Sequence, residues 1–268
     1  MRRAAAGLAL LAASVGIVAC SAPASSADAT GTVRIAAAAD LRFALDEITA
    51  LVEREHPELD VTTTYGSSGQ FVQQLRDGAP FDLYLSADRA YVQDLVDAGL
   101  ARSDDVFPYA IGRLVTWFPE GAPESGAGIE ALADDAVRTV AIANPEHAPY
   151  GRAALAALDS AGLRTAVDPK LVLGENVAQA AEFARSGNAD AGIVALSLVL
   201  SDPLRGLGSW TEVPLASYPR LDQAGVVLAD AADPAAADVV RAAMLGPEGR
   251  AILAEYGFSL PGDAAGAG

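Results

Sequence analysis

Short apolar runs alternate with helically spaced hydrophobic residues over the first hundred positions of the chain. Residues 33–38 predict a buried strand, and the apolar positions after it recur every three or four residues: Leu41, Ala44, Leu45, Ile48, Leu51 and Val52. Pro57 predicts the end of that helix. The pattern repeats with strands at 61–65 and 81–85, each followed by a helix, the first ending near Gly78 and the second spanning about 88–98.

A second series with the same alternation begins at Arg113. It predicts strands at 114–118, 139–143, 171–173, 189–194 and 225–228. It predicts helices at 152–161, 175–186, 234–245 and 247–256. Strands that alternate with helices are typical of largely parallel sheets covered on both faces, with ligands at the carboxyl ends of the strands.

Two such series predict two α/β lobes with a binding site between them. The expected division assigns 32–112 and 216–260 to lobe I, 113–215 to lobe II, and 261–268 to a disordered tail rich in Gly and Ala. A single α/β domain is the alternative.

The N-terminus resembles an export signal. Arg2 and Arg3 precede an apolar run that ends in Ile17, Val18, Ala19 and Cys20. This run is shorter and richer in alanine than a membrane span. Cys20 is the only cysteine, so it forms no internal disulfide, and its setting resembles the lipobox of bacterial lipoproteins. The resemblance predicts a signal peptide at 1–19, lipidation of Cys20, and a flexible tether at 20–31. An ordinary cleaved signal with a chance cysteine is the alternative.

The net charge of the chain limits the kinds of molecule that it can bind. The chain carries 18 Lys and Arg against 35 Asp and Glu. Removing a leader with two arginines leaves 16 basic residues and a net charge of −19, which argues against nucleic acid. An anionic ligand is still compatible, because helix N-termini and neutral hydroxyls can hold a desolvated anion without a cation. No later segment of the sequence is long and apolar enough to span a membrane.

Four loops carry candidate chemistry, each where a predicted strand leads into a helix. They are 36–41 (AAAADL), 65–70 (YGSSGQ), 144–151 (NPEHAPYG) and 174–177 (GENV). Small residues let the backbone approach a ligand, and hydroxyls and amides can donate hydrogen bonds to it. In isolation each loop also has a structural interpretation, with Ser68 and Asn176 as helix caps and Pro149 and Gly151 as turn residues.

The loops, taken in order, resemble those of the molybdate-binding proteins of ABC transporters. The resemblance spans about residues 32–260 and includes 33–48, 65–88, Asn144–His147, Gly192–Val194, Gly246–Gly249 and Tyr256–Phe258. It implies an α/β, two-lobed periplasmic-binding-protein fold of the class II type, with each lobe a mostly parallel sheet flanked by helices. It implies an extracytoplasmic, monomeric solute-binding lipoprotein that captures molybdate or tungstate and delivers it to the permease subunits, with no cofactor and no enzymatic activity.

The resemblance also implies the residues that hold the oxyanion by hydrogen bonds, without side chains that ligate the metal atom: Ala39, Asp40, Ser67, Ser68, Tyr150 and Val177. Two positions depart from the family pattern. Asp40 stands where the pattern has serine, and Tyr150 stands where it has alanine. The pattern also has a tyrosine at the position of Ala195, so a phenol moved from 195 to 150 would serve the same pocket. An exposed loop aromatic is the alternative for Tyr150.

Asp40 is the most awkward of these residues, because a carboxylate repels a dianion. Either its side chain turns away and caps the helix that begins at Leu41, or it stays in the pocket and is protonated when the anion is bound. We favour the capping arrangement, because Asp commonly precedes an amphipathic helix. For His147, a structural role such as a ring hydrogen bond that fixes its loop is favoured over catalysis. The segment Ser86–Asp88 is interpreted as a strand end and helix cap.

Other functions stay open at this stage. Sulfate or phosphate could replace molybdate, because discrimination depends on sub-ångström donor placement. A serine hydrolase with Ser68 as nucleophile and His147 as base is less favoured, since Gly66–Gly69 is not a G-x-S-x-G elbow. A purely structural surface lipoprotein would bind no solute.

Overall fold

The computed structural model describes residues 31–123 and 128–262. The predicted signal peptide, the Cys20 lipidation site and nearly all of the predicted tether lie outside these ranges, as do residues 263–268 of the predicted tail. In the described ranges, no helix is both long and apolar enough to cross a membrane.

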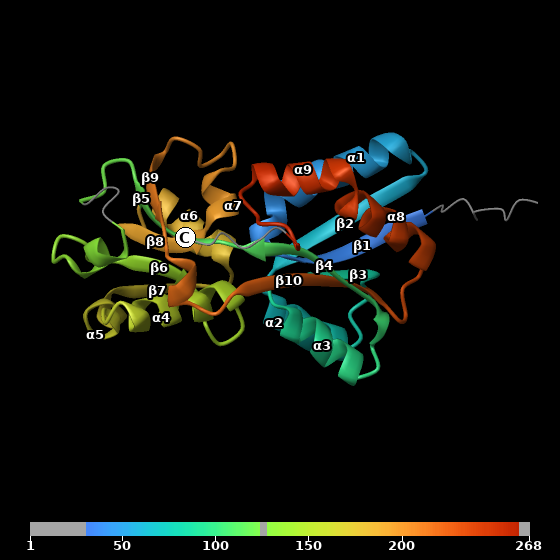
Figure 1. Cartoon of the computed structure of the whole chain (residues 1–268), viewed down its shortest axis with the longest axis horizontal. Coiled ribbons are helices and arrows are strands. Elements are labelled where there is room, and N and C mark those ends of the chain that lie inside the picture. Colours follow the sequence, from blue (N-terminus) through green and yellow to red (C-terminus); the bar gives the residue numbers. More distant parts are fainter. Residues whose placement is uncertain (1–30, 124–127, 263–268) are drawn as a thin grey trace, which may run out of the picture.

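Two lobes lie side by side, each built on one five-stranded sheet (Figure 1). We call lobe I the elements on the sheet with order β2-β1-β3-β10-β4. Its strands are β1 (Gly31–Ala38), β2 (Leu59–Gly66), β3 (Leu83–Ser86), β4 (Ala101–Gly112) and β10 (Leu221–Leu228). Its helices are α1 (Arg42–Glu55), α2 (Ser68–Arg76), α3 (Arg89–Asp97), α8 (Pro234–Leu245) and α9 (Pro247–Glu255).

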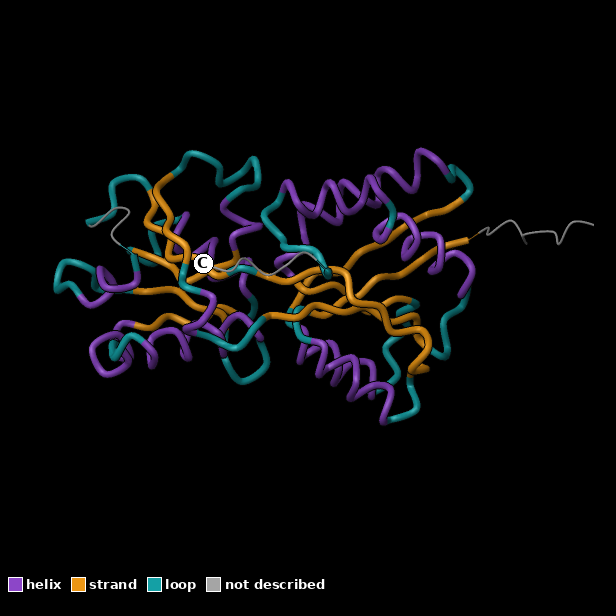
Figure 2. The backbone as a smooth tube through the Cα atoms, in the orientation of Figure 1, coloured by secondary structure: helices purple, strands orange, loops and turns teal. Residues whose placement is uncertain are grey.

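Helices cover both faces of the lobe I sheet (Figures 1 and 2). Helices α1, α8 and α9 pack on one side over a core that includes Ile35, Leu45 and Val240. Helices α2 and α3 pack on the other side over a second apolar layer, with Tyr84 and Val226 at its centre. Burying apolar side chains on both faces stabilises the sheet at about 25 cal/mol per Å² removed from water.

Lobe II carries the second sheet, with order β7-β6-β8-β5-β9. Its strands are β5 (Leu114–Pro119), β6 (Val140–Ala143), β7 (Leu171–Gly174), β8 (Ala191–Ala195) and β9 (Gly208–Glu212). Its α-helices are α4 (Pro149–Ser160), α5 (Arg164–Val167), α6 (Val177–Arg185) and α7 (Leu196–Val199). Short 3₁₀ helices occur at Ala39–Leu41, Ile129–Ala133, Asp168–Lys170 and Leu215–Ser217.

Both sheets are mixed rather than mostly parallel. In lobe I, β1 pairs in parallel with β2 and β3, whereas β10 is antiparallel to β3 and β4. In lobe II, β6 pairs in parallel with β7 and β8, whereas β5 is antiparallel to β8 and β9. The predicted parallel arrangement therefore holds for three strands of each sheet.

The antiparallel strands are those that carry the chain between lobes. Strand β4 ends at Gly112 and β5 begins at Leu114, so one residue separates the two sheets. The chain returns through the 3₁₀ helix Leu215–Ser217 into β10. Lobe II is thus an insertion between β4 and β10, and the two connections run side by side in the middle of the molecule (Figure 1).

Candidate functional site

All six predicted binding residues line one small cavity between the lobes. Ala39, Asp40, Ser67 and Ser68 come from lobe I, and Tyr150 and Val177 come from lobe II. The remaining lining residues are Ala38, Gly66, Ala87, Ala148, Pro149 and Asn176. The cavity measures about 10 Å³, close to the space of a single water-sized sphere. Residues of both lobes therefore meet around one small space.

Helix N-termini converge on this cavity from both lobes. Helix α2 begins at Ser68, α4 at Pro149 and α6 at Val177, and the 3₁₀ helix at Ala39 leads into α1. The first N–H groups of a helix have no intrahelical partner, and the helix dipole places partial positive charge there. Asn176 caps α6, as predicted, by accepting from the N–H groups of Ala178 and Gln179 at 3.1 and 3.0 Å.

The carboxyl of Asp40 bonds to Gln223 of its own lobe and to Tyr150 of lobe II, and it does not cap a helix. The side chain is buried, and its Oδ2 accepts from the Tyr150 hydroxyl at 3.1 Å and from Gln223 Nε2 at 2.5 Å. Neither the 3₁₀ helix at Ala39 nor α1 has a side-chain cap. The favoured capping arrangement is therefore wrong, because two tertiary donors take the carboxylate oxygen instead.

Burial sets the protonation of the Asp40 cluster. Loss of solvent raises the pKa of Asp40 to about 6, although the hydrogen bonds from Gln223 and Tyr150 oppose the rise. Burial, together with the charge of Asp40, also raises the pKa of Tyr150 well above its ordinary value, so the phenol stays protonated at neutral pH. Tyr150 is 2% exposed, so the alternative of an exposed loop aromatic is wrong.

The two serines play different structural parts. Ser68 is the first residue of α2, and its Oγ accepts the Ala87 N–H at 3.1 Å, which leaves its own proton available. Ser67, and not Ser68, occupies the cap position of α2, but its hydroxyl donates to the His147 carbonyl at 2.7 Å instead of capping. The interpretation of Ser68 as a cap is therefore wrong.

His147 fixes its loop against lobe I by a ring hydrogen bond, as predicted. Its Nδ1 lies 2.9 Å from Ser67 Oγ, and its carbonyl also accepts from the Gly69 N–H at 3.0 Å. Because the Ser67 proton goes to the carbonyl, the ring nitrogen donates to Ser67 Oγ. His147 is thus a bridge between the lobes.

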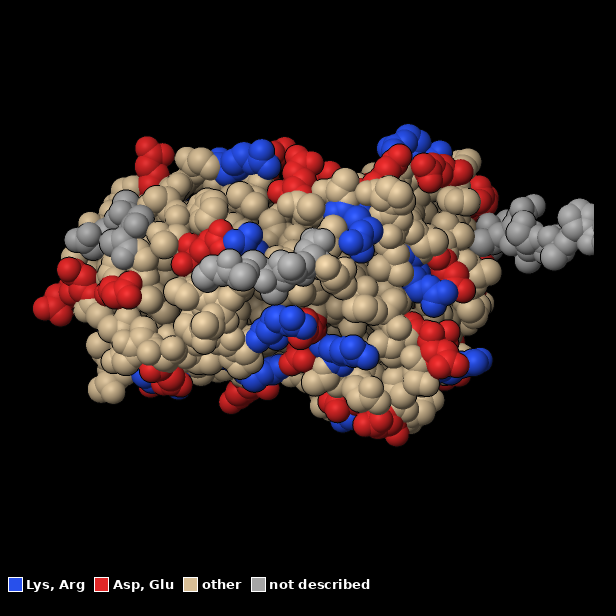
Figure 3. Space-filling view, viewed as in Figure 1, with Lys and Arg blue, Asp and Glu red and all other residues tan. Residues whose placement is uncertain are grey.

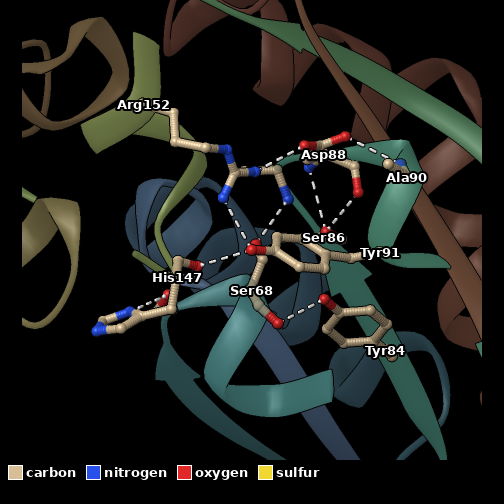
Figure 4. A network of polar contacts seen from close by, with 10 residues as sticks. Ser68, Tyr84, Ser86, Asp88, Ala90, Tyr91, His147 and Arg152 are labelled. Carbon is tan, nitrogen blue, oxygen red and sulfur yellow. Dashed lines mark hydrogen bonds and ion pairs between the residues drawn. The ribbon is translucent and has the colours of Figure 1, made fainter. Parts of the chain in front are cut away.

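Arg152 of α4 makes a second bridge between the lobes (Figure 4). Its guanidinium donates to Asp88 Oδ2 and to the Tyr91 hydroxyl, both at 2.8 Å, and lies 5.2 Å from the Tyr91 ring centre. Asp88 also caps α3 by accepting from the Ala90 N–H at 2.9 Å, as predicted for this segment. A fixed carboxylate on lobe I thereby meets a cation on lobe II.

Sequence reasoning missed several residues that shape the cavity. Gln223 holds Asp40, and Ser197 Oγ donates to the Asp40 carbonyl at 2.7 Å. Gly112, at the crossing between lobes, lets Tyr150 approach, since a Cβ there would lie 2.3 Å from the phenol oxygen. These residues lie far from Asp40 in sequence, and no local motif marks them.

Several larger surface grooves lie elsewhere. Two of them run beside Arg42, Phe43 and Leu204 and beside Ile129, Thr211 and Pro214. Both grooves are larger than the interlobe cavity, but neither is lined by the set of helix N-termini and hydroxyls that surrounds that cavity. Among the described residues, no group of three or more His, Cys, Asp and Glu side chains could hold a metal ion.

The chain is similar in sequence and in structure to known solute-binding proteins. The family described as bacterial extracellular solute-binding protein matches residues 33–259. The molybdate-binding protein ModA of Rhodobacter capsulatus is 38% identical over 230 residues, covering 86% of this chain and 89% of that protein. ModA of Azotobacter vinelandii is 35% identical over 91% of this chain and 94% of its own length. The solved structure of the Azotobacter vinelandii periplasmic molybdate-binding protein superposes with a TM-score of 0.78 at 30% identity, covering 85% of this chain and 99% of that one.

Proposed function

The chain belongs to the bacterial extracellular solute-binding proteins, and from this premise we propose that it captures molybdate between its lobes and delivers it to an ABC importer. It works outside the cytoplasmic membrane, as its family does. Two relatives that match it over most of their length are molybdate-binding proteins. Tungstate, which presents the same tetrahedron of oxygens, is the second ligand that we propose.

One observation supports the oxyanion most directly. Four element N-termini and the Ser68 hydroxyl meet at a cavity of about 10 Å³ whose lining contains no lysine or arginine. Such a site can hold a compact anion through N–H and O–H donors alone.

We assign the donors residue by residue. The Ser68 hydroxyl donates, since its oxygen already accepts from Ala87. The N–H of Val177 donates at the start of α6, because Asn176 takes the next two N–H groups. Backbone N–H groups at Ala39 and Ser67 complete the lobe I side, and Asp40 and Tyr150 close the cavity on the remaining side.

The hydrolase alternative loses support from the direction of one hydrogen bond. A nucleophilic serine must donate to its histidine. Here the Ser67 proton goes to the His147 carbonyl, and the imidazole Nδ1 bonds to Ser67 instead of Ser68. We therefore propose a transport protein without enzymatic activity, acting as a monomer.

Calorimetric titration with molybdate, tungstate, sulfate and phosphate tests the function. We expect saturable binding at one site for molybdate and tungstate, and weaker or undetectable binding for sulfate and phosphate. Tighter binding of sulfate or phosphate would reassign the ligand within the oxyanions. Absence of heat with all four anions would contradict the proposal.

Attachment to the membrane is a separate proposal. The lone Cys20 at the end of an apolar leader would carry the lipid anchor and keep the protein near the permease. We expect Cys20→Ala to release the protein from the membrane fraction without changing the affinity of the mature protein for molybdate. Continued lipid-dependent fractionation with membranes would show that Cys20 is not the anchor, and Ser21→Ala serves as the matched control.

A further inference from the structure

Two buried acceptor atoms beside the cavity have no hydrogen-bond partner. They are Asp40 Oδ1 and Gln223 Oε1, which belong to the same cluster, since Gln223 Nε2 donates to Asp40 Oδ2. An unpartnered buried acceptor costs free energy until a donor reaches it. Asp40 lines the cavity that we assign to the oxyanion. The cluster is therefore built to receive a proton from that side.

The groups that face Asp40 offer no positive charge. Tyr150 of α4 and Gln223 of β10 bond to its carboxyl, Tyr109 of β4 lies within its electrostatic reach, and the Ser197 hydroxyl of α7 takes its carbonyl. An ionised Asp40 and a dianion in this desolvated space would repel each other, and the backbone N–H groups of Asp40 and Leu41 and the nearby helix N-termini offset this repulsion only with partial charges.

The direction of the Tyr150 hydrogen bond makes the conflict sharper. While Asp40 is ionised, the phenol proton points to Oδ2 at 3.1 Å, so Tyr150 can offer only a lone pair to an anion. One proton on the carboxyl reverses this pattern. With the proton on Oδ1, Asp40 donates to the anion, and with the proton on Oδ2, Asp40 donates to the phenol oxygen and frees the phenol proton for the anion.

We propose that capture of the oxyanion takes up one proton, held between Asp40 and the bound anion, so that Asp40 makes binding respond to pH. The proposal rests on the proposed function, because it concerns the same cavity. The step is a proton transfer alone: a buffer acid or hydronium ion gives up its proton, and an O–H bond forms on the Asp40 carboxylate as the dianion enters. The raised pKa of Asp40 in the empty pocket, about 6, means that this proton is available at little cost near neutral pH.

Calorimetry with molybdate at pH 6.5, 7.25 and 8.0, in two buffers of different ionisation enthalpy, measures both affinity and proton uptake. For the wild type we expect uptake of about one proton at pH 8 and affinity that falls by up to about tenfold per pH unit. The amide of Asp40→Asn can donate a hydrogen bond without taking up a proton. For this variant we expect the affinity for molybdate to change by less than about twofold between pH 6.5 and 8.0. The neutral variant should also bind more tightly than the wild type at pH 8.

The controls separate this effect from other titrations. Histidine can also gain a proton near neutral pH, and Asp40→Asn keeps His147 in place. Asp94→Asn removes an exposed carboxylate of α3 in the same lobe and should keep the wild-type profile. The buffer comparison on the wild type needs no variant, so the test stands even if Asp40→Asn does not fold.

The outcomes distinguish the two proposals. Molybdate binding with affinity independent of pH and no proton uptake would overturn the role of Asp40 and leave the proposed function intact. An unchanged slope in Asp40→Asn would assign the proton to another group and would also overturn it. Absence of molybdate binding in both proteins at every pH would instead contradict the proposed function.

Discussion

Molybdate at 1,000 times its dissociation constant is expected to raise the free energy of unfolding by about 4 kcal/mol. The reason is that the donors we assign to it come from both lobes, on elements as distant in sequence as α2 and α6, and meet only in the folded protein. The unfolded chain has no such site. Thermal or urea denaturation with and without molybdate, at the concentration that calorimetry defines, measures the gain.

Gly151→Ala should remove most of this gain. A Cβ at Gly151 would lie 2.1 Å from the Ala143 carbonyl oxygen, a backbone atom of β6 that cannot move freely. The start of α4 must then shift and carry Tyr150 and Pro149 out of position. We expect an affinity loss of about a hundredfold, which corresponds to about 2.7 kcal/mol and to the loss of one or two hydrogen bonds to a charged ligand. Overpacking should also lower the stability of the empty protein by about 1–3 kcal/mol.

A matched change on the same helix provides the control. Ser160→Ala alters the exposed end of α4, far along the helix from the cavity, and should keep the full gain from molybdate. An unchanged unfolding temperature of the wild type with all four oxyanions would defeat the oxyanion function. A full gain in Gly151→Ala would show that the start of α4 does not hold the ligand.

The four loops that contain the six candidate residues could be predicted because each follows a strand that the sequence pattern indicates, whereas the residues within the loops were implied by the family resemblance. In an α/β sheet the loops after parallel strands gather at one edge, so 36–41, 65–70, 144–151 and 174–177 had to converge if the strands were right. Strands β1, β2, β6 and β7 are indeed parallel within their sheets. The local sequence pattern therefore predicted both the two lobes and the place where the four loops meet.

Strands β4 and β9 left too weak a pattern to be predicted. The first half of β4 is polar and charged, at Arg102–Asp105, and Pro108 interrupts the rest. Proline is tolerated there because β4 is the edge strand of its sheet. Strand β9 is also an edge strand, only five residues long, with just two half-buried positions. Edge strands need little apolar surface, so their sequences give little signal.

The side-chain arrangement at Asp40 could not be predicted from local sequence at all. An aspartate before an amphipathic helix usually caps it, and that preference is worth about 1 kcal/mol. Here Tyr150 and Gln223, 110 and 183 residues away, provide two donors to the same oxygen. Long-range contacts of this kind form only in the folded protein, so the local sequence does not reveal the direction of the Asp40 side chain.

Asp40 should also make the stability of the empty protein depend on pH. Its pKa rises from an ordinary 3.8 to about 6 in the folded state, chiefly through burial. A group whose pKa is raised on folding stabilises the protein fully below its unfolded pKa, and this contribution is lost as pH rises through the folded value. A shift of about two pKa units corresponds to a loss of about 3 kcal/mol between pH 4 and pH 7.5.

Other buried carboxyls act with the opposite sign, so the wild type alone does not isolate this effect. Burial raises the pKa of Asp82, but hydrogen bonds from Arg34 and the Ala232 N–H outweigh it and leave the pKa below its ordinary value. Asp190 behaves likewise, with burial opposed by donors from Arg138 and Thr139. The contribution of these groups to the stability of the protein decreases as pH falls. Only the difference between the wild type and an Asp40 variant removes their contribution.

Asp40→Asn supplies that difference, because the amide has nearly the same shape and does not titrate. Urea unfolding of both proteins is measured at pH 4.0, 5.5 and 7.5 without molybdate. As pH rises, the free energy of unfolding of the variant should increase relative to that of the wild type by about 3 kcal/mol. The expected change lies between pH 4 and about 7, the window that the pKa of about 6 defines. Asp94→Asn, on the exposed face of α3, should track the wild type throughout. A constant difference between Asp40→Asn and the wild type across this window would mean that Asp40 keeps its ordinary pKa in the empty pocket. The proton taken up with the anion would then have to overcome the full cost of protonating a carboxylate at neutral pH.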